Sequence, residues 1–144
     1  MTPGVNITMA MPASAEQVFA WLTQPEYFSA WFGGSAVEVP LDRCTLDVRP
    51  GGAWHAVMIL PDGEEISWDG DYLTVEAPGE LVFTITDQPG DERDTVAVTV
   101  IDRGEGSEIT LQQFGGGLSE AQYADAAAGW RMFLEAMAKL AHRD

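Results

Sequence analysis

Residues 119–143 read SEAQYADAAAGWRMFLEAMAKLAHR, and this stretch decides the fold. Ser119 followed three residues later by Gln122 has the form of a capping box, in which each side chain satisfies a backbone N–H at the start of a helix. From Tyr123 onward, apolar residues recur at three- and four-residue spacing, which predicts a long helix with one wholly apolar face. That face comprises Tyr123, Ala126, Ala127, Trp130, Phe133, Leu134, Met137, Leu140 and Ala141.

The apolar face of this helix changes character along its length. Alanines line its first half, whereas Trp130, Phe133 and Met137 lie in its second half. A sheet packed against this face would meet large side chains at one end and open space at the other. Two interpretations follow: an ordinary core helix with a tapering partner, or a helix that roofs a cavity.

The rest of the chain predicts an antiparallel sheet. Residues Val5–Met11 alternate with a period of two, as in a half-buried strand. Two short helices follow, one after the capping box of Ser14 and Gln17 and one over Pro25–Phe32. Gly33 and Gly34 end the second helix. Strand patterns then cover residues 37–48 (interrupted at Pro40), 53–60, 65–75, 81–86, 95–102 and 107–114.

Short turns separate these strands, and the polar run 87–94 is expected to be an exposed loop. Short connections favour antiparallel neighbours. The predicted class is α+β: a curved antiparallel sheet of about six to seven strands wrapped around the long C-terminal helix, with the two short helices after the first strand. The length of 144 residues fits a single domain over 1–144.

The composition excludes several classes of function. Seven Lys plus Arg stand against 23 Asp plus Glu, giving a formal charge of −16, so nucleic acid and anionic membranes are repelled. Cys44 is the single cysteine, which leaves no internal disulfide. No apolar run reaches the ~20 residues of a membrane span. A soluble, cytoplasmic protein without membrane insertion, either a monomer or a homodimer, is expected.

Large apolar side chains of the predicted strands and helices form the candidate site. They either line one apolar pocket or fill a solid core. This set is Trp54, Met58, Trp68, Tyr72, Phe83, Ile85, Trp130 and Met137. Trp31 and Phe32 come just before the double glycine, where they would lie at the mouth of such a pocket or plug its end.

Gln113 adds a polar group to this set, because it shares a strand face with Ile109 and Leu111. An unpaired amide there would cost ~1–3 kcal/mol, so Gln113 must find a partner. Tyr72, Trp68 or water is the expected partner, and a ligand carbonyl or hydroxyl is the alternative. Tyr72 combines an apolar ring with a polar tip in the same way.

The titratable residues do not suggest a catalytic site. His55 lies on the strand face opposite Trp54, and Asp69 and Asp71 lie opposite Trp68 and Tyr72, so they point away from any cavity. The acidic residues of the 87–94 run lack the order of a calcium loop, and no His or Cys spacing suggests zinc. The triglycine 115–117 lacks a neighbouring cation, which makes it a hinge or cavity gate rather than an anion site. We expect no catalytic residue, metal or cofactor.

Several short motifs, in this order, resemble the START-like superfamily, also called SRPBCC or birch-pollen-allergen type. The closest branch is similar to the activator of the 90-kDa heat-shock protein ATPase. The motifs are Pro12–Phe19, Pro25-Glu26, Trp31–Gly33, Asp47–Trp54, Asp62-Gly63, Gly70 before Tyr72-Leu73, Leu81–Thr84 and Gly129-Trp130.

The resemblance implies a helix-grip fold with an apolar cavity between the C-terminal helix and the concave sheet, entered near the two short helices. Members bind lipids or other hydrophobic molecules, cyclise polyketides, receive hormones, confer self-resistance in antibiotic clusters, or stimulate a chaperone in the stress response. Fold alone does not choose among these tasks. We expect binding of a small hydrophobic or aromatic molecule. A chaperone-interacting module is one alternative, and a cyclase, hydrolase or self-resistance enzyme acting on a polyketide-like ligand is another.

Overall fold

A computed structural model describes residues 4–33, 37–86, 93–115 and 118–142 of the chain. Its helices are α1 (Ala15–Thr23), α2 (Pro25–Trp31) and α3 (Glu120–Ala138), with short 3-10 turns η1 (Leu41–Arg43) and η2 (Lys139–His142). Its strands are β1 (Val5–Met11), β2 (Cys44–Leu46), β3 (Ala53–Ile59), β4 (Glu65–Glu76), β5 (Glu80–Ile85), β6 (Asp94–Arg103) and β7 (Gly106–Phe114).

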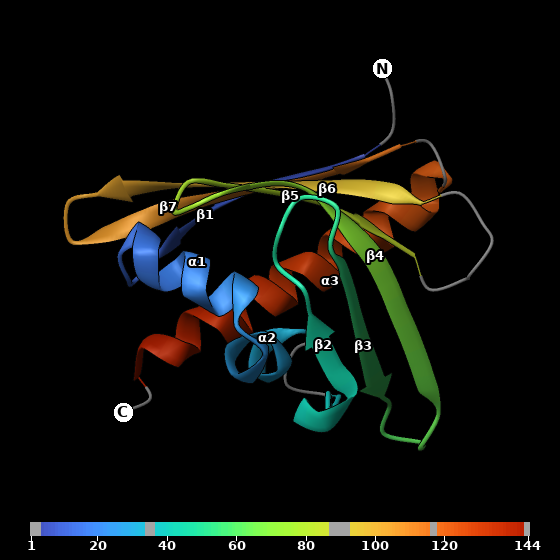
Figure 1. Cartoon of the computed structure of the whole chain (residues 1–144). Coiled ribbons are helices and arrows are strands. Elements are labelled where there is room, and N and C mark those ends of the chain that lie inside the picture. The colour runs from blue at the N-terminus through green and yellow to red at the C-terminus, as the bar shows by residue number, and fades with distance from the viewer. Residues whose placement is uncertain (1–3, 34–36, 87–92, 116–117, 143–144) are drawn as a thin grey trace.

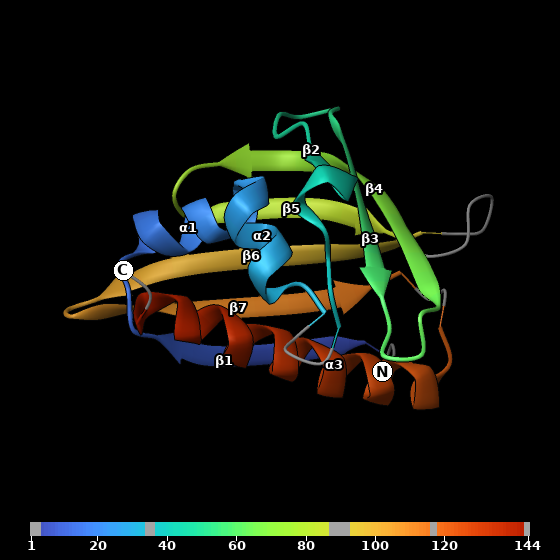
Figure 2. The same cartoon turned by 90° about the horizontal axis from the view of Figure 1, so that it is seen from below.

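The strands form one antiparallel sheet in the order β1-β7-β6-β5-β4-β3-β2. The first strand therefore closes against the last one, and every other pair is a neighbour along the chain. All three helices lie on one side of this sheet, and β2, β3 and β4 bend toward that side (Figure 1). Viewed from the helix side, α3 runs along β1, whereas α1 contacts β6 and β7, and α2 contacts α3 and β2 (Figure 2). This is the predicted helix-grip arrangement.

Both predicted capping boxes are present. The Ser14 hydroxyl accepts from the Gln17 backbone N–H, and the Ser119 hydroxyl accepts from the Gln122 backbone N–H at 3.1 Å. The start of α1 is also tied to the sheet, because the Ala15 N–H donates to Asp102 Oδ1 at 2.8 Å. These bonds fix where each helix begins and therefore which of its faces meets the sheet.

The apolar face of α3 is the face that meets the sheet. Tyr123, Trp130, Leu134 and Met137 are buried, and Asp125 and Glu135, on the opposite side of the helix, are exposed. None of the helices among the described residues combines the length and apolarity needed to cross a membrane.

Two sequence predictions about the strands were wrong. Most of residues 37–48 is not strand: Glu38 makes a single bridge to Ile59, η1 follows Pro40, and only Cys44–Leu46 pairs with β3. Pro40 has no backbone N–H to donate to a ladder, which accounts for the interruption. Asp94 is not an exposed loop residue either, since it begins β6 with 5% of its surface exposed. Residues 34–36, 87–92 and 116–117, including most of the expected loop and gate, lie outside the described residues.

Candidate ligand-binding site

Aromatic side chains from α2, the sheet and α3 form one buried cluster beneath the short helices. Phe32, directly after α2, lies at its centre and is 2% exposed. Its ring centroid lies 4.6 Å from that of Phe28, 5.8 Å from Trp54, 6.1 Å from Trp68 and 5.5 Å from Phe133. Phe83 and Tyr72 extend the cluster from Trp54 across β4 and β5. Sequence reasoning did not include Phe28 and Phe133 in the site, although the helical spacing placed both on apolar faces.

A small apolar cavity lies between the two short helices and β3–β5. Leu22 of α1, Phe28 and Trp31 of α2, and Trp54, Tyr72 and Phe83 of the sheet line it, together with Leu81. The cavity has a volume of about 10 Å³, which is room for roughly one water molecule. The aromatic side chains therefore fill most of the space beneath α1 and α2, and this cavity lies under these helices rather than under α3.

The two short helices are joined by a buried hydrogen bond. The indole N–H of Trp31 in α2 donates to the backbone carbonyl of Trp21 in α1 at 2.8 Å. Trp31 is 1% exposed, so this bond is shielded from water. By contrast, α2 meets the sheet through the rings of Phe28 and Phe32 against Trp54. The helix pair therefore forms one unit, which is hydrogen-bonded to β6 at the start of α1 and contacts β3 through the rings of α2 and Phe32.

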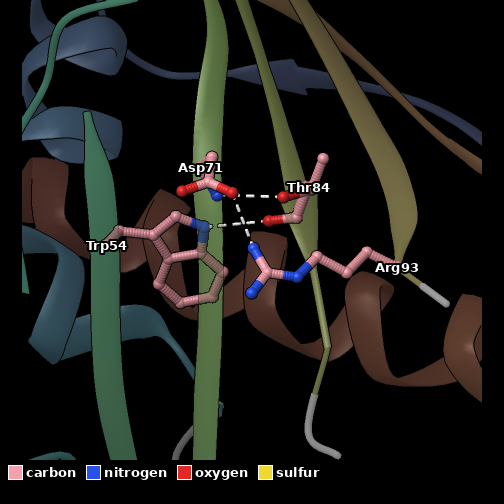
Figure 3. Close-up of polar contacts among 4 residues, drawn as sticks. All are labelled: Trp54, Asp71, Thr84 and Arg93. Carbon is pink, nitrogen blue, oxygen red and sulfur yellow. Dashed lines mark hydrogen bonds and ion pairs between the residues drawn. The ribbon is translucent and has the colours of Figure 1, made fainter. Parts of the chain in front are cut away.

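Trp54 interrupts the hydrogen-bond ladder between β4 and β5. Its indole N–H donates to the carbonyl oxygen of Thr84 at 2.9 Å, and the backbone N–H of Asp71 donates to the Thr84 hydroxyl at 2.9 Å (Figure 3). The ring lies over Gly70, its partner in the β3–β4 register. A side chain at Gly70 would collide with both the Thr84 carbonyl and the Trp54 indole nitrogen. Glycine is therefore required at this position.

The polar partners of Gln113 differ from those expected. Gln113 donates through Nε2 to Asp94 Oδ2 at 3.0 Å and accepts through Oε1 from the Trp130 indole N–H at 2.7 Å. All three residues are at most 7% exposed. The expected partners Tyr72 and Trp68 do not take this role. Asp94 shares its strand face with Val96 and Val98, and this periodicity is the signal that identifies it as an inward residue.

Trp68 has a buried side-chain donor, its indole N–H, without a partner among the described residues. The ring belongs to the aromatic cluster through its contact with Phe32. An unsatisfied buried donor costs ~1–3 kcal/mol, so this N–H is an exception that calls for an explanation.

Two titratable groups lie near one another at the β2–β4 side of the core, and burial keeps both protonated. Burial raises the pKa of the Cys44 thiol to about 11. Burial, with smaller contributions from Cys44 and Asp47, also raises the pKa of the Tyr72 phenol. Neither group is a nucleophile or base at neutral pH. At neutral pH, Cys44 and Tyr72 therefore contribute uncharged groups to the core.

The charged residues of β3 and β4 lie on the outer face of the sheet. His55 Nδ1 lies 2.7 Å from Asp69 Oδ1, and the Arg93 guanidinium lies 2.7 Å from Asp71 Oδ2 (Figure 3). These side chains are between 34% and 49% exposed. No group of three or more metal-ligating side chains occurs in the part of the chain that the structure describes. The expected outward orientation of His55, Asp69 and Asp71 is confirmed.

The residues predicted to bind a ligand fall into three groups in the structure. Trp31, Trp54, Tyr72 and Phe83 line the small cavity. Phe32, Trp68 and Trp130 belong to the same aromatic cluster, and Gln113 is bonded to Trp130. Met58, Ile85 and Met137 are buried in the core but do not line that cavity. A ligand-binding role for these residues stays a prediction.

A comparison with protein families identifies the family to which the chain belongs. The family model described as Activator of Hsp90 ATPase homolog 1-like protein matches residues 12–142. The chain belongs to this family. A comparison with curated proteins gave no significant match.

Several solved structures share the fold of this chain. The AHSA1 protein of Silicibacter pomeroyi is 23% identical with a TM-score of 0.85, covering 98% of this chain and 99% of that one. An Arthrobacter aurescens protein is 19% identical with a TM-score of 0.85, covering 98% and 87%. DynU16, from the dynemicin biosynthetic locus, is 19% identical with a TM-score of 0.79, covering 99% of this chain and 48% of its own.

Proposed function

We propose that this protein binds a small hydrophobic molecule between its two short helices and the concave face of the sheet. The observation that carries the proposal is the buried aromatic cluster, whose rings come from α2, β3, β4, β5 and α3, and in which the rings of α2, β3, β4 and β5 line an apolar cavity. Flat aromatic side chains offer large apolar contact area with little loss of conformational entropy, which suits recognition of an apolar or aromatic ligand.

Binding requires the cluster to open. A cavity of about 10 Å³ holds about one water rather than an organic ligand. The Ala15–Asp102 hydrogen bond holds the start of α1 on the sheet, whereas the α2 end rests on Trp54 through ring contacts, which a ligand can replace with equivalent ring contacts of its own. The Trp31–Trp21 hydrogen bond keeps the two helices together as they move. We therefore expect the ligand to enter by displacing Phe28 and Phe32 from Trp54.

A filled cavity tests this proposal. Leu22→Trp adds a large ring beneath α1, in the space that a ligand would occupy when the cluster opens, whereas Leu73→Trp makes the same substitution at a residue that is 52% exposed. Binding of an uncharged naphthalene derivative is measured by isothermal titration calorimetry. We expect wild type and Leu73→Trp to bind alike and Leu22→Trp to lose at least tenfold in affinity. Equal affinity in all three proteins, or no binding by wild type, would overturn the proposal.

Interaction with a chaperone is the second candidate, and the description of the family favours it. The acidic surface expected from the formal charge of −16 would suit a basic docking surface on a partner. The test is the ATPase rate of purified Hsp90 with and without this protein. Saturable stimulation that survives Leu22→Trp would favour this function over ligand binding.

A cyclase or self-resistance enzyme is a further alternative, because DynU16 comes from the dynemicin biosynthetic locus. Catalysis of that kind needs an acid or base facing the ligand, and the burial that raises the pKa of Tyr72 leaves its phenol a weak one. Turnover of a polyketide-like substrate that is lost in Tyr72→Phe would support the enzyme.

A further inference from the structure

We propose that the ligand carries an uncharged carbonyl oxygen, and that the indole N–H of Trp68 binds it. The inference rests on the proposed function and specifies the class of ligand: a hydrophobic ketone, quinone, ester or amide rather than a hydrocarbon or a fatty acid. The hydrogen bonds of the buried tryptophans, the position of Trp68 and the charges around the cluster support it.

Three tryptophans near the cluster have their indole N–H satisfied inside the protein. Trp31 donates to the Trp21 carbonyl, Trp54 to the Thr84 carbonyl and Trp130 to the Gln113 side chain, at 2.7–2.9 Å. Each has a dedicated acceptor, and the Trp54 acceptor even requires a break in a strand ladder. Trp68 is the exception, since its buried N–H has no acceptor among the described residues. Among the described residues, the Trp68 N–H and the Ser107 hydroxyl are the buried side-chain groups without a partner. Of the two, the Trp68 donor belongs to the aromatic cluster, which indicates that its acceptor comes from a ligand bound there.

The position of Trp68 connects this donor to the proposed binding site. Its ring lies on β4 against Phe32, with 6.1 Å between the ring centroids. Phe32 also contacts Phe28 of α2 and Trp54, which line the cavity. A ligand ring that displaces Phe32 therefore enters beside Trp68. A carbonyl on that ring can then accept from the indole N–H while the ring keeps the aromatic contacts that Phe32 leaves.

The surrounding charges favour an uncharged acceptor. The cavity is lined by apolar and aromatic side chains. Arg43, Arg49, Arg93 and Arg103 each pair with a carboxylate elsewhere, and Arg131 and Lys139 are exposed on the C-terminal helical segment. The chain as a whole has a formal charge of −16. A carboxylate ligand would lose its hydration without gaining a cationic partner, whereas a neutral carbonyl needs one donor. A carbonyl compound is therefore preferred over a fatty acid.

Three matched probes test the proposal: methyl naphthyl ketone, ethylnaphthalene and naphthoate. They share one ring system and differ in the acceptor, which is neutral, absent or charged. Affinities are measured by calorimetry for wild type and for Trp68→Phe, which keeps a ring but lacks the N–H. The indole N–H resonances of wild type are followed in parallel by NMR with nitrogen-labelled tryptophan. The Trp31, Trp54 and Trp130 protons are already bonded, so their resonances report the ring-current shifts that the ketone and ethylnaphthalene have in common.

We expect wild type to bind the ketone roughly tenfold more tightly than ethylnaphthalene and naphthoate, the effect of about one buried hydrogen bond. The ketone, but not ethylnaphthalene, should move the Trp68 N–H resonance downfield. The Trp68→Phe variant should bind the ketone and ethylnaphthalene with similar affinity. Should this variant fail to fold, the wild-type resonance decides alone. Equal binding of ketone and ethylnaphthalene with no downfield shift would overturn the inference and leave the proposed function intact. No binding of any probe would overturn both.

Discussion

The indole nitrogen of Trp54 lies 2.9 Å from the carbonyl oxygen of Thr84, in a position where a β4 backbone N–H would normally complete the ladder. This contact requires the space that Gly70 leaves empty. Gly70→Ala should therefore force Trp54 or β5 to shift and lower the free energy of unfolding by about 3 kcal/mol. Urea unfolding measures the change.

Gly129→Ala is the matched control for this substitution. Gly129 lies within α3, and an added methyl group would contact nothing within 4 Å. Alanine is favoured over glycine in a helix, so this variant should be more stable than wild type by roughly 0.5–1 kcal/mol. If Gly70→Ala lowered the free energy of unfolding by less than about 1 kcal/mol, the Trp54 indole and β5 would be able to shift at little cost, contrary to this prediction.

The buried chain from Asp94 through Gln113 to Trp130 should respond to mutation as a coupled unit. Gln113→Met removes the acceptor of the Trp130 N–H and should lower stability by about 2 kcal/mol, since a buried donor becomes unpaired. Trp130→Phe removes that donor and leaves the Gln113 oxygen unpaired. The double variant leaves neither group of this pair unpaired, so its loss should fall short of the sum of the single losses by about 1 kcal/mol or more. If the stability losses of the two single variants added up to that of the double variant, Gln113 and Trp130 would contribute to stability independently.

The hydroxyl of Ser107 should be a stability defect. Ser107 is 2% exposed and its oxygen has no hydrogen-bond partner among the described residues. Ser107→Ala should therefore raise the free energy of unfolding by about 1 kcal/mol. Ser119→Ala, which removes the N-cap of α3, should lower it by about the same amount. If thermal and urea unfolding both showed Ser107→Ala to be destabilised, the hydroxyl would have a partner after all.

Stability should fall at alkaline pH because of Cys44. Burial raises the pKa of its thiol from the usual 9.0 to about 11. The folded state therefore holds the proton more tightly than the unfolded state, and this contribution is complete below about pH 9 and lost as pH rises to about 11. Cys44→Ala should show a flatter decline over this range in urea unfolding, with Tyr72 accounting for part of what remains. An unchanged slope in the variant would contradict the assignment.

Local periodicity predicted the elements that depend on it. The two capping boxes and the apolar face around Trp130 fixed α1 and α3, and strict alternation fixed β1, β6 and β7. The strand prediction for residues 37–48 included the interruption at Pro40 but not its extent, since a 3-10 turn follows the proline and ladder pairing begins only at Cys44.

The contacts of the candidate site depend on distant strands, so the sequence predicted its residues better than its bonds. Gln113 was correctly expected to point inward and to need a partner. Its partners Trp130 and Asp94 lie 17 and 19 residues away, and their alignment depends on sheet register and helix rotation together. The sequence left open whether Phe32 lies at the mouth of a pocket or plugs its end. Its contacts with Trp54 and Phe133 in the structure place Phe32 at the centre of the aromatic cluster.

Native mass spectrometry of the protein isolated from its host tests the central claim of ligand binding most directly. Leu73→Trp and Leu22→Trp are isolated in parallel. We predict that wild type and Leu73→Trp retain an uncharged, carbonyl-containing hydrophobic molecule, and that Leu22→Trp has only the mass of the polypeptide. If wild type also has only the polypeptide mass under conditions gentle enough to preserve a control ligand complex, ligand binding in the host is contradicted.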